Sequence, residues 1–239
     1  MKKLYQKNEL TFAILWIVAY VVLFSLADGL SEATGIPKLY TLFLGFAMAA
    51  VLIGFIGKNG LTKYYGLCRV RGSLKGYLYF LPLILISTCN LWGGLSMPDN
   101  LLKALPSIVT LSMAGILEEL IFRGLLFKAM SRNDQKAAVI VGSLTFGMGH
   151  IVNLLSGAPV PETLLQIAYA TAIGYLFIII FLKSGSIVPC IIAHCVINGM
   201  SAFGRDAGTL LNIITAVLLV IIPVAYALWL QRKAAEQIA

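Results

Sequence analysis

Charged side chains are scarce in this chain, and their scarcity argues against an ordinary soluble domain. Only 12% of the 239 residues are Asp, Glu, Lys or Arg, whereas a soluble domain carries about 25%. Hydrophobic residues make up 59% of the chain. Nothing in the sequence resembles a soluble module, a long linker or a low-complexity tail. We therefore expect residues 1–239 to form a single integral membrane domain.

Cysteine and histidine are also few. The four cysteines lack the spacing of a zinc ribbon or a disulfide framework, and three of them lie in apolar stretches as small hydrophobes. No HExxH motif is present among the residues around the two histidines. The net charge of +8 comes from basic residues spread among short loops, which favours contact with membrane lipids and no nucleic acid partner.

Long apolar runs recur along the chain, and each is long enough to cross a hydrocarbon core of about 30 Å. Because backbone polar groups must be paired within lipid, continuous apolar runs predict helices, so the fold class is all-α and polytopic. We expect eight spans. Their predicted limits are 10–28, 38–57, 74–93, 104–128, 136–155, 162–182, 187–203 and 208–231.

The first apolar run has a second reading. Lys2, Lys3 and Lys7 form a basic start, and the segment 25–27 resembles a signal-peptidase site. The run is long for a signal peptide, so an uncleaved helix is favoured, and the rest of the topology is the same in either case.

Basic residues are distributed unevenly between the two sides of this layout. Of the 18 Lys and Arg residues, only Lys38, Lys103 and Arg205 fall in the segments predicted to lie outside. By the positive-inside rule, both termini are expected in the cytoplasm.

Ionisable residues inside the predicted spans are few and concentrated. An ionisable residue there costs about 2.5–3.5 kcal/mol on insertion scales and indicates function by default. Glu118, Glu119 and Arg123 lie in the fourth run. Glu119 and Arg123 are one helical turn apart, so the arginine can neutralise that carboxylate. Glu118 is offset by about 100° and is expected to point elsewhere, free for chemistry.

The only two histidines also lie within predicted helices. His150 follows Phe146 by one turn, and Asn198 follows His194 by one turn. These groups suit amide hydrolysis: a poorly solvated carboxylate activates water, and imidazole and carboxamide groups bind the water and the oxyanion. We therefore expect Glu118 as the base, His150 as its water-binding partner, and His194 with Asn198 as the oxyanion site. Glu119, Arg123 and Phe146 are expected to support them.

The order EExxxR, FxxxH and HxxxN on three separate helices resembles the CPBP family, which comprises CAAX-type prenyl endopeptidases and Abi bacteriocin-processing and immunity proteins. The motifs are Glu118-Glu119 with Arg123, Phe146 with His150, and His194 with Asn198. The resemblance implies a catalytic core at about 100–204, within an eight-helix intramembrane protease whose cavity opens to the cytoplasm. It also implies the roles given above.

No cofactor is expected, although zinc is an alternative. Glu118, His150 and His194 could supply a His₂Glu zinc set, but using both imidazoles as ligands would weaken the oxyanion site, so metal-independent chemistry is favoured. One feature fits the proposed site poorly. Counting residues along each predicted span places His150 near the outer end of its helix and Glu118 near the middle of its own, so the two side chains are expected at different depths in the membrane.

The predicted function is therefore an intramembrane endopeptidase that hydrolyses a peptide bond near the C-terminal or membrane-proximal part of a peptide or protein substrate. Two alternatives remain: a non-catalytic immunity or scaffold protein of the same fold, and a proton-coupled transporter, for which no repeated broken-helix pattern is visible. A bacterial plasma membrane is the expected location. The sequence favours no substrate identity and no oligomeric state.

Overall fold

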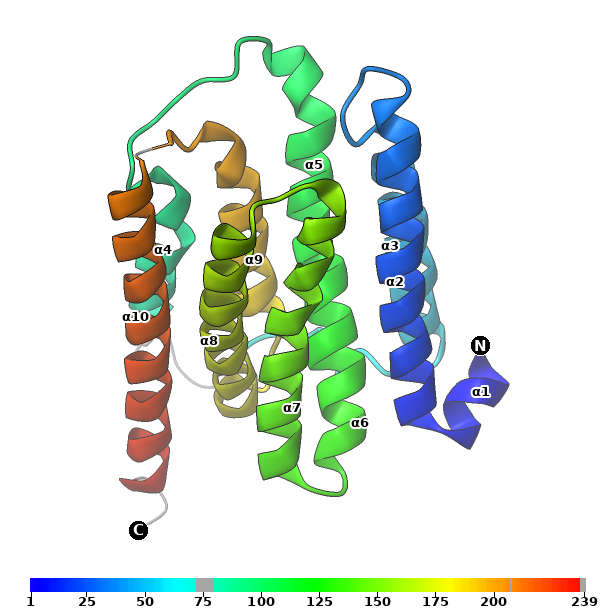
Figure 1. The fold of residues 1–239 in the computed structure, drawn as a ribbon. Helices are drawn as coiled ribbons and strands as arrows, with labels where there is room; N and C mark the ends of the chain where they lie inside the picture. Colours follow the sequence, from blue (N-terminus) through cyan, green and yellow to red (C-terminus); the bar gives the residue numbers. More distant parts are fainter. Residues whose placement is uncertain (72–79, 207, 237–239) are drawn as a thin grey trace.

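The computed structural model describes residues 1–71, 80–206 and 208–236 and shows a helical bundle (Figure 1). Across the described residues there is no strand, only an isolated bridge between Leu95 and Gly204. The first half contains α1 (Lys2–Lys7), α2 (Glu9–Glu32), α3 (Leu39–Lys58), α4 (Leu81–Ser87) and η2 (Cys89–Leu91). The second half contains α5 (Leu101–Glu118), η3 (Glu119–Leu126), α6 (Phe127–Ser131), α7 (Gln135–Met148), η4 (Gly149–Ser156), α8 (Val160–Ser184), α9 (Val188–Met200), η5 (Ser201–Phe203) and α10 (Thr209–Glu236).

Short polar side chains start several of these helices. Asn8 accepts a hydrogen bond from the Thr11 amide at the start of α2, and Asn100 caps α5 in the same way. Asp134 accepts from two amides in the first turn of α7. These caps satisfy backbone donors that have no partner within the helix. Gly185, with φ +68°, ends α8 in the left-handed conformation that glycine adopts without a steric penalty.

Among the residues that the structure describes, six helices are long and apolar enough to cross a membrane: Glu9–Glu32, Leu39–Lys58, Leu101–Ser131, Gln135–Ser156, Val160–Ser184 and Thr209–Arg232. The all-helical membrane class is thus confirmed, whereas the count of eight spans stays a prediction. The predicted span 187–203 corresponds to a shorter apolar helix, Val188–Phe203. The predicted span 74–93 lies partly outside the described residues, and its described part forms only α4 and η2.

The segment from Leu101 to Ser131 runs without a break but changes its winding. Residues Glu119–Leu126 form a π-helix between α5 and α6. The wider π turn shifts the facing of every later side chain, and such turns are frequent at functional sites. The apolar pattern of this run predicts a helix but gives no sign of the altered turn.

The middle of the bundle is built around α5. In Figure 1, α5 lies between α3 on one side and α9 on the other, and contacts between residues confirm both neighbours. On the side of the molecule away from α2 and α3, α8 packs against α7 and α10. The start of α2, the turn between α6 and α7, and the end of α10 lie at one end of the bundle (Figure 1). This matches termini on one membrane side, while the assignment of that side to the cytoplasm stays a prediction.

Candidate active site

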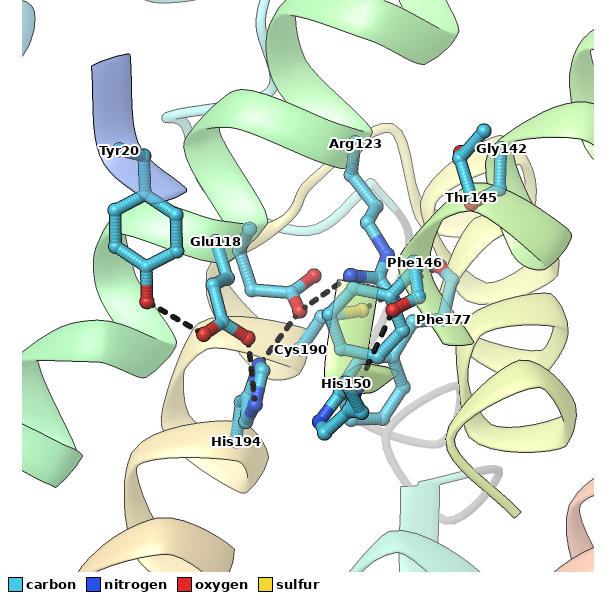
Figure 2. Close-up of polar contacts among 11 residues, drawn as sticks. Tyr20, Glu118, Arg123, Gly142, Thr145, Phe146, His150, Phe177, Cys190 and His194 are labelled. Atoms are coloured by element: carbon cyan, nitrogen blue, oxygen red, sulfur yellow. Dashed lines mark hydrogen bonds and ion pairs between the residues drawn. The ribbon is translucent and has the colours of Figure 1, made fainter. Parts of the chain in front are cut away.

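The two adjacent glutamates lie where the helix changes its winding. Glu118 is the last residue of α5, and Glu119 is the first residue of the π-helix. Figure 2 shows their surroundings, with side chains contributed by α2, α7, α8 and α9 as well as by this helix. The site therefore joins segments that are far apart in the sequence.

Glu119 and Arg123 form the expected ion pair. Arg123 Nη1 lies 3.0 Å from Glu119 Oε1, and neither side chain is exposed. The guanidinium carbon lies 3.9 Å from the centroid of the Phe146 ring and 5.4 Å from that of Phe177. The cation is thus stabilised by one carboxylate and two aromatic faces. A fully buried charge requires such partners, because its desolvation is costly.

Glycine makes room for this arginine. A Cβ atom at Gly174 would lie 3.1 Å from the Phe146 ring and 3.3 Å from Arg123 Nη2. Since Gly174 lies in α8, a larger residue there would press on the cation and its aromatic partner together. The space for the buried Arg123 side chain therefore depends on the glycine in α8 as well as on η3, the segment that carries the arginine.

His194 contacts both glutamates. Its Nδ1 lies 2.9 Å from Glu119 Oε1, and its Nε2 lies 3.5 Å from Glu118 Oε2. Because a carboxylate paired with arginine only accepts, the proton in the shorter contact belongs to Nδ1. The expectation that Glu118 points away from the Glu119 group is wrong: the imidazole bridges the two carboxylates. Glu118 and Glu119 both have ordinary α-helical dihedral angles, and the two carboxylates are joined because His194 contacts them through its two different ring nitrogens.

Close packing of two helices places this imidazole. A Cβ atom at Gly115 of α5 would lie 2.9 Å from the backbone nitrogen of Cys195 and 3.1 Å from the carbonyl carbon of His194. Only glycine lets the α9 backbone approach α5 so closely without displacement. Gly115 thus sets the distance between the helix that carries Glu118 and the helix that carries His194.

Tyr20 is a member of the site that the sequence did not indicate. Its hydroxyl donates to Glu118 Oε1 at 2.6 Å, across 98 residues of chain. Figure 2 shows Tyr20 and His194 approaching the two oxygens of Glu118. Tyr20 lies in α2 among apolar neighbours and has no motif around it, so only the tertiary structure identifies it.

His150 lies beside Phe146 at the start of η4. The ring centroid of Phe146 is 5.6 Å from the centroid of His150 and 5.6 Å from that of His194. The phenyl ring therefore connects the two imidazoles edge to face. His150 Nδ1 lies 3.3 Å from the Phe146 carbonyl oxygen, which assigns the proton to Nδ1. Within the described part of the chain, no hydrogen bond or ion pair joins His150 to Glu118.

Asn198 is one turn beyond His194 on α9 but has a different partner. Its Nδ2 donates to the carbonyl oxygen of Leu111 in α5 at 3.1 Å. This bond connects α9 to α5. It uses one of the two hydrogens on the Asn198 side-chain amide, and the Leu111 carbonyl does not engage the other. The site residues thus comprise a cluster of Glu118, Glu119, Arg123 and His194, to which His150 is connected through the Phe146 ring, while Asn198 bonds to the α5 backbone.

Exposure rises from Arg123 toward Glu118. The Arg123 and Glu119 side chains are 0% exposed, His194 is 9% exposed and Glu118 is 17% exposed. Glu118 is therefore the carboxylate of the cluster that water can reach. Among residues 1–71, 80–206 and 208–236, no three His, Cys, Asp or Glu side chains are grouped so that they could hold a metal ion, and Glu118, His150 and His194 do not form such a group in this geometry.

Comparison with known proteins bears on this region of the chain. Residues 100–200 match the family model described as Type II CAAX prenyl endopeptidase Rce1-like. No curated protein and no solved structure matches the chain. The matched segment contains Glu118, Glu119, Arg123, Phe146, His150, His194 and Asn198. The predicted resemblance to CAAX proteases of the CPBP family is thereby confirmed.

Proposed function

Because residues 100–200 match the family model of the Rce1-like type II CAAX prenyl endopeptidases, we propose that this chain is an intramembrane endopeptidase in which Glu118 activates water. The bond that it cuts would lie near the C-terminal or membrane-proximal part of a peptide or protein. The observation that carries the proposal is the asymmetry of the two glutamates: Glu119 is neutralised and sealed off, while Glu118 is reachable by water.

Glu118 is held in a single orientation by two side chains. Tyr20 donates to one carboxylate oxygen, and His194 Nε2 faces the other. A base that is fixed before the substrate arrives gives up little entropy on reaching the transition state. In the proposed reaction, Glu118 takes a proton from water, the resulting hydroxide attacks the scissile carbonyl carbon, and the proton passes to the leaving amine.

His194 changes its partner as the reaction proceeds. In this proposal His194 is an imidazolium, with Nδ1–H directed at Glu119 and Nε2–H attracted to Glu118 while Glu118 is ionised. Once Glu118 has accepted the proton from water, this attraction falls, and the Nε2–H group becomes available to the oxyanion. The second amide hydrogen of Asn198 would add a further donor to the same oxyanion. Glu119 holds Nδ1 throughout and keeps the ring in place.

His150 would bind the attacking water. With its proton on Nδ1, toward the Phe146 carbonyl, its Nε2 is left as an acceptor. Phe146 fixes the ring by edge-to-face contact and also covers Arg123. This assignment uses the protein's own residues alone, and no step in it passes through a metal ion.

The experiment is cleavage by the purified chain of a farnesylated peptide that ends in a CAAX sequence, beside the same peptide without the lipid. For Glu118→Gln, we expect kcat/KM to fall by at least about 100-fold, because the variant loses a general base. Glu162→Gln is the matched control, since Glu162 is exposed at the start of α8.

Three results would overturn all or part of the proposal. Cleavage by Glu118→Gln at the wild-type rate would remove Glu118 from the mechanism. Absence of cleavage by the wild-type chain, with family peptides that a positive-control protease cuts, would favour the alternative of a non-catalytic immunity or scaffold protein. Inactivation by a chelator, reversed by zinc, would replace the metal-independent route.

A further inference from the structure

A cavity of about 640 Å³ lies apart from the candidate active site, at the end of the bundle that holds the α6–α7 turn. Its walls come from the loop after α3 and from the ends of α6 and α8. Lys128 on its wall follows Glu118 by ten residues, which corresponds to roughly 15 Å along a helix. The cavity is therefore separate from the proposed cleavage chemistry.

The cavity is lined by cations. Lys63, Arg71, Lys128 and Arg132 contribute to its wall, and no acidic residue lines it. Arg132 is neutralised, since its Nη1 lies 3.0 Å from Glu9 Oε2. The other three form no ion pair with any acidic side chain that the structure describes. Three positive charges thus face one space whose wall carries no acidic side chain, and Glu9, which attracts Lys128, is already paired with Arg132, a situation that favours an anion.

Two of these cations are held in place by packing. Lys128 Nζ lies 4.7 Å from the centroid of Tyr64 and 5.9 Å from that of Phe181. The Arg71 amide donates to the Ser184 carbonyl at 2.9 Å, and its guanidinium group lies so close to Gly185 that a Cβ atom there would be 2.6 Å from Nε. Aromatic faces and a glycine therefore lie against two of the charges, while Lys63 and Arg71 remain exposed to water on the cavity wall.

The position of the cavity indicates the kind of anion. It lies where α6 ends, α7 begins and α8 ends, and all three belong to segments long and apolar enough to span a membrane. Phosphate groups of lipids lie at this level of a bilayer. Leu182 lines the cavity and is 39% exposed on α8, so apolar surface continues outward from the cations. A free phosphate would gain nothing from that surface, whereas a lipid would.

We propose that this cavity binds the phosphate of an anionic phospholipid headgroup, held by Lys63, Arg71 and Lys128. A bound phosphate would relieve the repulsion between Arg71 and Lys128. Its acyl chains would leave past Leu182 along the outside of α8. The proposal does not depend on peptide cleavage, and it holds for either orientation of the chain in the membrane.

Binding can be measured on the full chain purified in an uncharged detergent. The probes are dihexanoyl phosphatidylglycerol, dihexanoyl phosphatidylcholine and inorganic phosphate, each titrated while thermal unfolding is followed. We expect saturable binding of phosphatidylglycerol and clearly weaker binding of the other two. Each cation removed should weaken binding about fivefold, the equivalent of about 1 kcal/mol per basic residue near anionic lipid.

The variants separate a built site from diffuse charge. Lys128→Gln and Lys63→Gln should each weaken phosphatidylglycerol about fivefold, and Lys128→Gln combined with Arg71→Gln about 25-fold. Lys136→Gln is the control, because Lys136 is exposed at the same end but does not line the cavity. If Lys136→Gln weakens binding as much as Lys128→Gln, the effect is diffuse surface charge and the proposal fails.

The other probes can overturn it as well. Equal affinity for phosphatidylcholine would show that the headgroup charge is not recognised. Equal affinity for inorganic phosphate would show a site for free phosphate and would remove the lipid from the proposal. Single variants at Lys63 and Lys128 keep the test valid if the double variant does not fold.

Discussion

Two Arg–Glu ion pairs of the described residues have the same separation but differ in the exposure of the arginine. Arg123 and Glu119 lie 3.0 Å apart with neither side chain exposed, whereas Arg132 and Glu9 lie 3.0 Å apart with Arg132 68% exposed and Glu9 8% exposed. The attraction of the exposed pair is screened by water and ions. At the scale of single residues, burial therefore decides what each pair contributes to stability.

Replacing each arginine by methionine tests this difference. Arg123→Met leaves Glu119 buried beside a neutral side chain, and we expect the free energy of unfolding to fall by about 3–5 kcal/mol. Arg132→Met should change it by less than about 1 kcal/mol. Thermal unfolding of both variants in the same detergent is the measurement, and equal losses would contradict the assigned roles.

Tyr20 allows a test of positioning without loss of the base. Tyr20→Phe removes only the hydroxyl that donates to Glu118. A hydrogen bond to a charged group contributes about 1.5–3 kcal/mol, so we expect kcat to fall roughly tenfold or more, with KM unchanged. Tyr175→Phe is the control, since its hydroxyl donates to Gln231 on the exposed side of the bundle. An unchanged kcat in Tyr20→Phe would show that Tyr20 does not hold the base.

Sequence spacing predicts some of these residue contacts and misses others. The Glu119–Arg123 pair follows from an interval of one turn, and the structure contains it. The contact of Tyr20 with Glu118 joins residues 98 positions apart, and nothing in the local pattern of α2 distinguishes this tyrosine. Contacts within one helix are encoded in spacing, whereas contacts between helices depend on packing that spacing does not report.

At the scale of elements, the approach of α9 to α5 is a tight backbone contact beside the site. The α9 backbone lies over Gly115, and no side chain separates the two helices there. Asn198 adds a hydrogen bond from α9 to the α5 backbone nearby. Both contacts fix the height and rotation of the helix turn that carries His194.

Gly115→Ala should therefore impair both stability and cleavage. The added Cβ would meet backbone atoms of α9 at 2.9–3.1 Å, which cannot move without shifting the whole helix. Such overpacking costs about 1–3 kcal/mol, and the displaced His194 would lower kcat. Gly54→Ala in α3 is the control, because nothing lies within 4 Å of its added Cβ. An active, equally stable Gly115→Ala would contradict this account of the contact.

Most helices follow from the apolar runs, but their internal changes of winding do not. The predicted limits 38–57 and 162–182 lie within helices Leu39–Lys58 and Val160–Ser184 or one residue outside them. The π-helix at Glu119–Leu126 and the 3₁₀ segment at Gly149–Ser156 leave the apolar composition unchanged. Hydropathy therefore predicts where helices lie, whereas side-chain facing across Glu118 and the placement of His150 required the structure.

For the whole molecule, the uneven distribution of basic residues makes a prediction about sidedness. Lys38 precedes α3, Lys103 lies in the first turn of α5 and Arg205 precedes α10, at the end of the bundle opposite the α6–α7 turn in Figure 1, and the residues that line the cationic cavity lie around that turn. We expect the cavity end to face the cytoplasm. Green fluorescent protein fused after Arg232 should fluoresce, and alkaline phosphatase fused after Asp206 should be active. The reverse pattern would contradict the predicted orientation.

The unequal lengths of two helices have a consequence for the bilayer. The 31-residue helix from Leu101 to Ser131 extends about 46 Å, whereas the 13 residues of α9 extend only about 20 Å. A hydrocarbon layer about 30 Å thick cannot match both lengths, so we expect the longer helix to tilt or to extend beyond the lipid, and the lipid to thin wherever it meets the shorter helix. Hydrophobic mismatch would therefore change the angle between the helices that hold Glu118 and His194. The acyl-chain length of the host membrane would then affect how these two side chains are placed relative to each other.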